Sequence, residues 1–228
     1  TPKNAHRGDT VTVTVTPDDG YKLDALIVTD KDGNTVPVTE KNGKYTFRMP
    51  ASKVTVRASF VVDAAAVNFV DVPADAYYHD AVLWAVEKGI TNGTDTTHFS
   101  PDFSCTRAQM VTFLWRASGS PGSKSDAMPF TDVKADSYYY DAVIWATENG
   151  ITNGISDTTF SPDDICTRAQ MVSFLYRMAD SPEVSGSTTF TDVAADAYYA
   201  KAVEWAKMNN ITNGIGGGLF GPDYDCTR

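Results

Sequence analysis

The sequence has few of the residues that hold metals or close disulfides, with three cysteines and three histidines among 228 residues. An odd number of cysteines excludes a closed disulfide framework, and no pair has the C-x2-C spacing of a zinc site. His6, His79 and His98 share no common spacing and form no triad or metal set. Several aspartates lie in loops, but the D-x-[DN]-x-[DN]-G spacing of an EF-hand is absent. We therefore expect no metal and no cofactor.

Basic residues are also scarce, since 19 Lys and Arg stand against 29 Asp and Glu, a net charge of -10. This balance argues against a nucleic-acid partner, which requires clustered basic side chains. Residues 1–62 hold nine basic and seven acidic residues, whereas residues 63–228 hold ten and twenty-two. The acidic charge therefore belongs to the larger, C-terminal part of the chain.

Long apolar segments are absent, because none approaches the roughly 20 residues needed to span a bilayer. We therefore expect no membrane insertion. The chain begins at Thr1 without an initiator methionine or a signal-peptide pattern and ends at Arg228. We expect it to be a segment of a larger protein. The residues present contain no nucleophile–base pair, paired-carboxylate cleft or phosphate loop, so we expect no enzyme activity in this segment.

Residues 1–62 have the period of two that is typical of strands. Thr10–Thr16 alternates threonine and valine strictly, and Asn42-Gly43 is a strong signal for a hairpin. Short strands are predicted at residues 10–16, 26–28, 35–39, 45–47 and 54–60. Five short strands in about 60 residues predict a small all-β module.

The rest of the chain repeats itself at intervals of 60 and 61 residues. The repeated features are Phe-x-Asp-Val from 69, 130 and 190, tryptophan at 84, 145 and 205, Ile-Thr-Asn-Gly from 90, 151 and 211, Phe-x-Pro-Asp from 99, 160 and 220, and Cys-Thr-Arg from 105, 166 and 226. Segments rich in Ser, Gly and Pro at 119–129 and 180–189 indicate linkers. We place the repeats at residues 67–120, 128–182 and 188–228.

Each repeat is predicted to form a helix, a loop and a second helix. Apolar residues in Tyr78–Val86 recur at helical spacing, and Gly89 provides a C-terminal stop. Thr106 followed by Gln109 is a capping-box pattern at the start of the second helix, and the second repeat has the same pattern. Because the sequence ends at Arg228, we expect the third repeat to lack its second helix. Part of a helical bundle would then be exposed, with lower stability or dimerisation as the result.

This repeat resembles the S-layer homology (SLH) domain over about residues 67–228. The resemblance depends on the motifs above, which agree in order and spacing three times. It implies mainly α-helical repeats in a pseudo-three-fold assembly, with grooves between repeats that hold a secondary cell-wall polysaccharide, often through a pyruvylated sugar. The family commonly has Ile/Val-Thr-Arg-Ala-Glu where this chain has Cys-Thr-Arg-Ala-Gln, a change that keeps the cap and removes one charge per repeat.

The β module is similar to short β repeats that accompany surface anchors in Gram-positive bacteria, including internalin B-repeats. Asp19-Gly20-Tyr21 and the segment Tyr45-x-Phe47-x-Met49-Pro50 carry that likeness. The resemblance implies a spacer or stalk rather than a binding domain.

Arg107, Arg168 and Arg228 are the leading candidates for contact with the ligand. Each is predicted in the first turn of a helix, where free N–H groups and the helix dipole favour an anion. A guanidinium there can bind a pyruvyl carboxylate in a bidentate manner. The acidic repeats need such local positive sites because their overall field repels an acidic glycan. An internal ion pair with the repeated aspartate remains the alternative.

Three other repeated positions could also contact a sugar, although structural roles are favoured for them. The tryptophans could stack on a sugar ring, but their mid-helix position favours the core. The glycines could allow close approach of a sugar, but a positive φ explains them more simply. The aspartates before the first helices suit turns or caps. These candidates are Trp84, Trp145, Trp205, Gly93, Gly154, Gly214, Asp71, Asp132 and Asp192.

Two further repeated features are expected to be structural. The cysteines precede the capping threonine of each repeat and are expected to be small buried apolar residues. The tyrosines beside the first helices are expected to wedge repeats together, with one hydroxyl near a groove. They are Tyr77-Tyr78, Tyr138–Tyr140 and Tyr198-Tyr199.

Together with the two resemblances, the sequence implies a multidomain, non-catalytic surface anchor, with a β spacer followed by α-helical SLH repeats. We expect it outside the cell, at the cell wall or S-layer, held non-covalently by cell-wall polysaccharide. Two alternatives stay open. The repeats could assemble protein to protein in a lattice or oligomer, or the chain could be the anchor of a surface enzyme whose catalytic part lies elsewhere.

Overall fold

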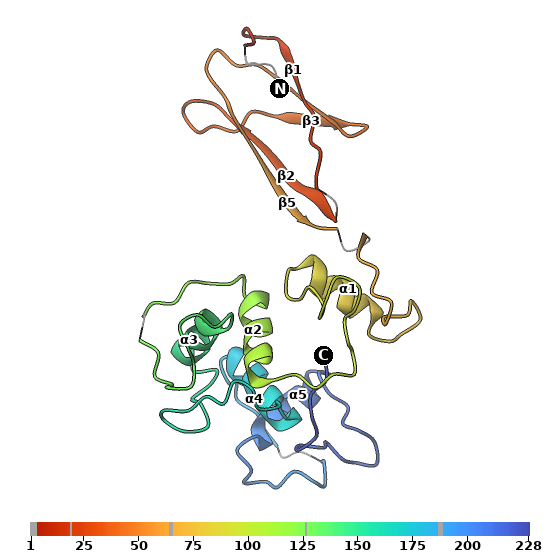
Figure 1. Ribbon diagram of the computed structural model, residues 1–228, viewed down its shortest axis with the longest axis vertical. Coiled ribbons are helices and arrows are strands. Elements are labelled where there is room, and N and C mark those ends of the chain that lie inside the picture. Colours follow the sequence, from red (N-terminus) through yellow and green to blue (C-terminus); the bar gives the residue numbers. More distant parts are fainter. Residues whose placement is uncertain (1–3, 19, 64–65, 126, 187–188) are drawn as a thin grey trace. The chain divides into compact units, whose positions relative to one another are not determined.

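A computed structural model describes residues 4–18, 20–63, 66–125, 127–186 and 189–228. These contain five strands followed by five helices (Figure 1). The chain divides into two compact units, Thr1–His98 and Phe99–Arg228, so the first repeat contributes to both. The predicted turn at 17–20 and the two predicted linkers lie partly outside the described residues.

The β module consists of two antiparallel sheets, as the alternating pattern predicts. β1 (Thr10–Val13), β4 (Lys44–Arg48) and β3 (Val38–Lys41) form a three-stranded sheet in that order. β2 (Tyr21–Thr29) pairs with β5 (Thr55–Val62), with one register shift in β2. Each of the five predicted strands overlaps an observed one, but β1 ends earlier than predicted, β2 is longer, and β3 lies toward the end of the predicted segment 35–39 and beyond it.

The module has a small core because alternate residues face inward. Val11 and Val13 of β1 are buried with Val28 and Phe47, while Thr10 and Thr12, which alternate with them, are exposed. Asn42 and Gly43 both have positive φ, 53° and 73°, as expected for the turn between β3 and β4.

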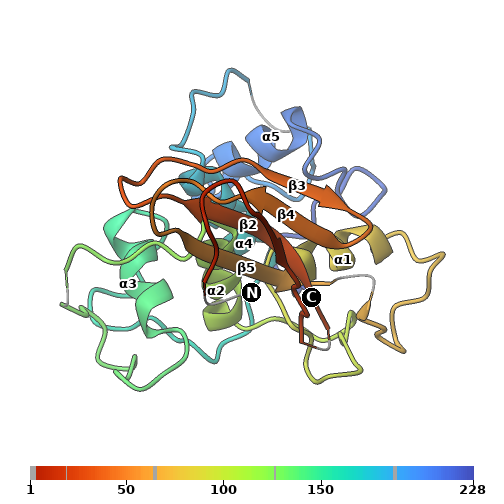
Figure 2. The same ribbon diagram turned by 90° about the horizontal axis from the view of Figure 1, so that it is seen from above.

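The five helices follow the helix–loop–helix prediction. The first helices of the three repeats are α1 (His79–Glu87), α3 (Tyr140–Glu148) and α5 (Ala200–Met208). The second helices are α2 (Arg107–Ala117) and α4 (Arg168–Met178), and the described part of the third repeat has none. In the second unit, α2 packs on α3 and α4 on α5 (Figure 2).

The second helices begin where the capping pattern predicts. Gln109 N donates to Thr106 Oγ1 at 3.3 Å, and Thr106 N donates to Gln109 Oε1 at 3.0 Å. The second repeat has the same reciprocal pair of bonds before α4. Glutamine therefore closes the capping box without the charge that glutamate would bring.

The three cysteine segments are joined in a cycle of backbone hydrogen bonds inside the second unit. Cys105 N donates to Cys226 O at 2.7 Å, Cys166 N to Cys105 O at 2.8 Å, and Cys226 N to Cys166 O at 2.9 Å. Cys105 and Cys166 are fully buried, as predicted, and Cys226 is partly buried. Burial raises the pKa of Cys166 to about 12 and that of Cys226 to about 11, so both remain thiols at neutral pH.

Candidate functional site

Arg107 is a buried cation that joins the first repeat to the second. Its side chain is 3% exposed, and its Nε donates to the carbonyl oxygen of Phe160 at 2.9 Å. Its guanidinium carbon lies 4.8 Å from the centre of the Phe160 ring and 5.6 Å from that of Phe174. Burial lowers the pKa of Arg107, although nearby anionic groups oppose this. Nη2 is buried and has no hydrogen-bond partner among the described residues.

The other two repeated arginines make the same contact with another repeat. Arg168 Nε donates to Phe220 O at 2.9 Å, and Arg228 Nε donates to Phe99 O at 2.8 Å. Their guanidinium carbons lie 4.8 and 5.1 Å from the centres of those rings. Each arginine thus holds the Phe-x-Pro loop of a different repeat from its own.

The expectation of free N–H groups beside these arginines is wrong. Arg107 N donates to Asp164 O at 2.9 Å, and Ala108 N donates to Pro162 O at 3.0 Å. The capping threonine accepts from the next N–H, at Gln109. The α4 start is occupied in the same way. These N–H groups bind carbonyls of the next repeat because the helix start packs against its loop.

The alternative of an internal ion pair is also wrong for two of the arginines. Among the described residues, neither Arg107 nor Arg168 has a carboxylate oxygen within 4.0 Å. Their partners are instead carbonyl oxygens, aromatic rings and, for Arg168, the hydroxyl of Thr212 at 3.4 Å, which favour a cation without neutralising it.

Two of the repeated aspartates, Asp132 and Asp192, fix loops, as the structural alternative predicted. The carboxylate of Asp132 accepts from Phe160 N at 2.9 Å and Ser161 N at 2.7 Å. Asp192 accepts from Phe220 N at 2.8 Å and Gly221 N at 2.7 Å. The start of each of these repeats is thereby tied to its own Phe-x-Pro loop. Asp71 has the equivalent sequence position in the first repeat.

The repeated glycines have the positive φ that was expected, 82° at Gly93, 75° at Gly154 and 77° at Gly214. A Cβ on Gly154 would lie 2.5 Å from Cε1 of Phe130 and 2.5 Å from the carbonyl oxygen of Thr159. The Cβ side of this glycine is therefore filled by its own repeat, which leaves no room there for a sugar.

The tryptophans differ from one another although their sequence positions are equivalent. Trp145 is 7% exposed and lies in the core, as predicted. Trp205 is partly buried and packs against Tyr176, with 5.7 Å between ring centres. Trp84 is 54% exposed, so core packing is wrong for this one.

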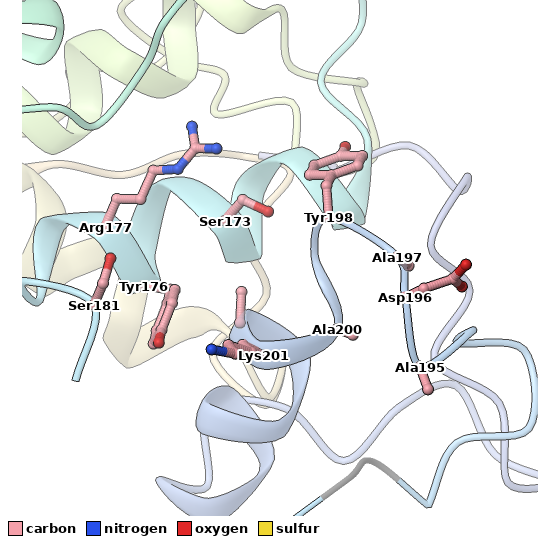
Figure 3. A pocket seen from close by; sticks show the side chains of 11 residues that line it. Ser173, Tyr176, Arg177, Ser181, Ala195, Asp196, Ala197, Tyr198, Ala200 and Lys201 are labelled. Atoms are coloured by element: carbon pink, nitrogen blue, oxygen red, sulfur yellow. The ribbon is translucent and has the colours of Figure 1, made fainter. Parts of the chain in front are cut away.

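A groove of about 360 Å³ lies where the second repeat meets the third. It is lined by Ser173, Tyr176, Arg177, Ser181, residues 195–197, Tyr198 and residues 200–202. In Figure 3, Ser173 lies between Arg177 and Tyr198, and Lys201 lies beside Tyr176. The groove therefore combines cationic, hydroxyl and aromatic groups from two repeats with one carboxylate, that of Asp196.

Tyr198 connects this groove with one of the predicted arginines. Burial raises the pKa of Tyr198, and the positive charges of Arg107 and Arg177 oppose that rise. The phenol is therefore neutral at neutral pH and lies in the field of two guanidiniums from two other repeats. Tyr198 is still 66% exposed, so a ligand can reach it.

The same arrangement occurs one repeat earlier. Burial raises the pKa of Tyr138, and Arg116 and Arg228 oppose the rise. Tyr138 is 62% exposed. We call the groove of about 360 Å³ the second groove, with Arg107 acting on its Tyr198 from outside the lining, and the equivalent surface around Tyr138, Arg116 and Arg228 the first groove. Of the three predicted arginines, Arg107 and Arg228 influence Tyr198 and Tyr138 electrostatically without lining the 360 Å³ groove, and Arg168 lines a different, apolar cavity.

Arg116 and Arg177 were missed by sequence reasoning. They occupy the last turn of α2 and α4 and recur at the repeat interval of 61 residues. That recurrence was a usable signal, but helix ends are common places for arginine, where they complement the dipole. Nothing in the sequence alone pairs them with a tyrosine of the next repeat.

The described residues offer no metal site, since they contain no group of three or more His, Cys, Asp or Glu that could hold an ion. No helix among them is both long and apolar enough to cross a membrane.

Protein-family comparison decides the identity of the repeats. Residues 68–111, 129–172 and 189–228 match the S-layer homology domain, more than half of the chain. The chain belongs to the S-layer homology family. Residues 1–64 match the divergent InlB B-repeat domain, as the β module's resemblance implied. The SLH repeats identify the chain as part of a cell-surface anchor, located outside the cell at the cell wall.

Curated proteins similar to this SLH chain include both surface-layer proteins and enzymes. A surface-layer 125 kDa protein of Lysinibacillus sphaericus is 29% identical over 180 residues, 77% of this chain and 15% of that protein. A cell surface protein of Thermoanaerobacter kivui is 37% identical over 102 residues, 42% of this chain and 13% of that protein. An endoglucanase of Bacillus sp. (strain KSM-635) is 30% identical over 166 residues, 70% of this chain and 17% of that protein. The chain thus spans about a sixth or less of these relatives.

Proposed function

We propose that the SLH repeats anchor a larger surface protein by binding an anionic secondary cell-wall polysaccharide in the grooves between repeats. The observation that carries this proposal is the position of Tyr198 in a groove of about 360 Å³, within the fields of Arg107 and Arg177. The proposed anchoring group is an acidic sugar, such as one with a terminal pyruvyl ketal. The chain itself acts in this proposal without catalysis.

The chemistry of the second groove suits such a ligand. Arg177 lines the groove and can bind a carboxylate, while Arg107, whose guanidinium is buried against Phe160, adds positive charge from behind the lining. A neutral phenol can donate a hydrogen bond to a sugar oxygen, and an aromatic ring can pack against the C–H face of a pyranose. A volume near 360 Å³ is in the range of small-ligand sites.

The acidic charge of the repeats makes these arginines necessary. The overall field repels an acidic polymer, so attraction has to come from positive groups close to the bound carboxylate. The proposal gives that role to Arg107 and Arg177 in the second groove and to Arg228 and Arg116 in the first. The repeated glycines and aspartates support the loops beside the grooves.

We further propose that the repeats, at 67–120, 128–182 and 188–228, form a pseudo-three-fold assembly. The cyclic hydrogen bonds of the three cysteine segments support this arrangement. So does the recurring hydrogen bond from each arginine to the Phe-x-Pro loop of another repeat. In such an assembly, every groove is built from more than one repeat.

Retention on purified cell walls tests the proposal. The chain and an Arg177→Ala variant would be mixed with walls before and after mild acid removal of pyruvyl ketals. We expect the chain to be retained only on untreated walls and Arg177→Ala to lose at least about 90% of that retention. Arg57→Ala, which changes an exposed arginine of β5, is the matched control and should be retained normally. Undiminished retention on treated walls would contradict the acidic-sugar claim.

The relatives also support a second proposal about what the chain carries. One relative is named an endoglucanase and another an endo-1,4-beta-xylanase A, so the anchored partner could be an enzyme rather than a lattice protein. Sequencing the parent gene on both sides of this segment would decide between a glycanase domain and a surface-layer domain. A parent with neither would contradict both.

The remaining alternative is that the repeats assemble protein to protein. The oligomeric state of Arg177→Ala, measured by sedimentation, distinguishes protein–protein assembly from glycan binding. Under the glycan proposal this variant loses wall retention while its sedimentation matches that of the unchanged chain. Loss of an oligomer together with wall retention would favour protein–protein assembly.

A further inference from the structure

The three cysteines of the chain recur at the same place in each repeat and meet inside the second unit. All three are free thiols in the structure. They are absent from the described lining of the second groove, so glycan binding does not use them. An aliphatic side chain would fill a buried position of this kind at least as well as a thiol.

Each pair of cysteines is directly opposed in a short antiparallel pairing of two repeats. Isolated bridges join Ser104 to Thr227, Thr106 to Ile165 and Thr167 to Asp225. One step along each of these pairings, the two opposed residues are both cysteines, so every cysteine lies opposite each of the other two. The backbone bonds of the cysteine cycle, 2.7, 2.8 and 2.9 Å long, join the same three pairs.

This register brings the thiols within reach of one another. Opposed residues of an antiparallel ladder have Cα atoms about 4.5–5.5 Å apart, and their side chains lie on the same face. A disulfide requires Cα atoms about 4.4–6.8 Å apart. Besides burial, the charges of Cys226 and Cys105 raise the pKa of Cys166, as expected for neighbouring thiols. All three pairs therefore meet the backbone requirement for a disulfide, and the movement that remains is rotation about two Cα–Cβ bonds.

Burial determines when such a bond can form. Cys105 and Cys166 are fully buried. Burial raises the pKa of each thiol and leaves little of the thiolate that attacks a disulfide. Exchange is therefore slow once the repeats have packed and is faster while they fold. The SLH repeats place the chain outside the cell, where disulfides form and persist.

We propose that the cysteine segments are the site of one disulfide between two repeats, with the third cysteine kept as a buried thiol. The oxidant is a low-molecular-weight disulfide that the chain meets while it folds. A thiolate of one repeat attacks this disulfide, forms a mixed disulfide and releases one small thiolate. A thiolate of another repeat then attacks the protein sulfur of the mixed disulfide and releases the second small thiolate. Two protein thiols are thereby oxidised, one small disulfide is reduced, and the two protons pass to the small thiols.

The folded register also predicts which pairs form. Cys105 and Cys226 are 121 positions apart, whereas the other two pairs are 61 and 60 positions apart. A random chain closes a loop of doubled length about threefold less often. In the folded register the distant pair is opposed in the same way as the nearer pairs. We therefore expect Cys105 and Cys226 to pair about as readily as the others.

Oxidative refolding of the full chain tests the proposal. The reduced, unfolded chain is refolded with oxidised glutathione, free thiols are counted in denaturant, and disulfides are mapped by mass spectrometry. The same oxidation carried out in denaturant is the reference without the register. Cys105→Val, Cys166→Val and Cys226→Val each leave one pair of cysteines, and the variant with all three changes is the matched control without thiols.

We expect one free thiol per refolded chain and a disulfide within that chain. Its Tm should be at least about 5 °C higher without a reductant than with one, because the disulfide restricts the unfolded chain. Cys166→Val, which keeps only the distant pair, should form its disulfide about as fully as the other two single variants. In denaturant it should form about threefold less. The control without thiols should have the same Tm with and without reductant.

Three free thiols after refolding, or disulfides that link only separate chains, would overturn the proposal. A linked chain that melts no higher than the reduced one would also overturn it, as would the same ratio of pairs after refolding as in denaturant. The unchanged chain contains all three pairs, so its disulfide map decides the question even where a single variant fails to fold. The thiol count does not depend on wall retention, so failure of this proposal is distinguishable from failure of glycan binding.

Discussion

Arg107 and Phe160 lie in different repeats and interact in two ways, through a cation–π contact and a hydrogen bond. The guanidinium carbon lies 4.8 Å from the ring centre, and Nε donates to the carbonyl oxygen of the same residue at 2.9 Å. Arg168 with Phe220 and Arg228 with Phe99 repeat the pair. Arg107 thus joins two repeats through its Nε, while its Nη2 is buried and makes no hydrogen bond among the described residues.

This geometry predicts different effects for two arginines of the second groove. Arg107→Ala should lower the free energy of unfolding by about 3 kcal/mol, because it removes the ring contact and leaves a buried carbonyl without a donor. Arg177→Ala should cost about 1 kcal/mol, the net value of its one bond to Ile151 O. Urea unfolding followed by tryptophan fluorescence measures both. Equal losses would show that Arg107 has no special role between repeats.

The two glycines of the Gly-Ile-Thr-Asn-Gly turn in the second repeat should differ in how well they tolerate substitution by alanine. Both have positive φ, 66° at Gly150 and 75° at Gly154. A Cβ meets nothing within 4 Å at Gly150, but at Gly154 it would overlap Phe130 and Thr159. We expect Gly150→Ala to cost about 1 kcal/mol and Gly154→Ala about 3 kcal/mol or more. Thermal unfolding of the two variants checks this, and a smaller loss at Gly154 would be the contrary result.

Acid should weaken the tie between Asp192 and its loop. Although burial raises the pKa of Asp192, hydrogen bonds from Phe220 N and Gly221 N lower it below its ordinary value overall. A lowered folded-state pKa contributes stability above the unfolded pKa of about 3.9, and this is lost as the pH falls toward the folded value. Tm should therefore fall less steeply below about pH 4 in Asp192→Asn than in the unchanged chain. If Tm changed with pH in the same way in both proteins, the Asp192 carboxylate would not contribute to the pH dependence of stability.

The two grooves should differ in affinity for an acidic sugar. Lys201 lines the second groove, whereas the equivalent position of the second repeat is Asp141. A cation at this exposed position is worth about 1 kcal/mol at most, or about fivefold in affinity. Lys201→Asp should weaken the tighter site by about that factor, and Asp141→Lys should strengthen the weaker one. Calorimetric titration with a pyruvylated sugar measures both sites, and unchanged affinities would show that this position lies outside the bound region.

Much of the fold was predictable from the sequence because its signals are local. The Thr-Val alternation of β1, the Asn42-Gly43 turn and the Thr106–Gln109 cap each act within a few residues. The hydrogen bond from each arginine to a phenylalanine carbonyl of another repeat was not predictable in this way. Arg107 acts on a residue 53 positions away, and its own repeat contains an equivalent phenylalanine at position 99.

The tryptophans show the same limit of sequence reasoning. Trp84 and Trp145 have the same place in their repeats, yet one is 54% exposed and the other 7%. Burial of Trp145 depends on the packing of α2 against α3, a contact between repeats. A repeated sequence position therefore predicts the local backbone, whereas the neighbours supplied by other repeats determine burial and charge.

The central claim is that a carboxylate-bearing sugar is held between guanidiniums beside Tyr198. The most direct test is calorimetric titration of the chain and of Arg177→Ala with a pyruvylated wall sugar and with the same sugar lacking the ketal. The account predicts binding of the pyruvylated sugar to the chain, and at least about tenfold weaker binding when either the ketal or the Arg177 side chain is removed. Equal affinity for the two sugars, or an Arg177→Ala variant that binds as well as the unchanged chain, would contradict it.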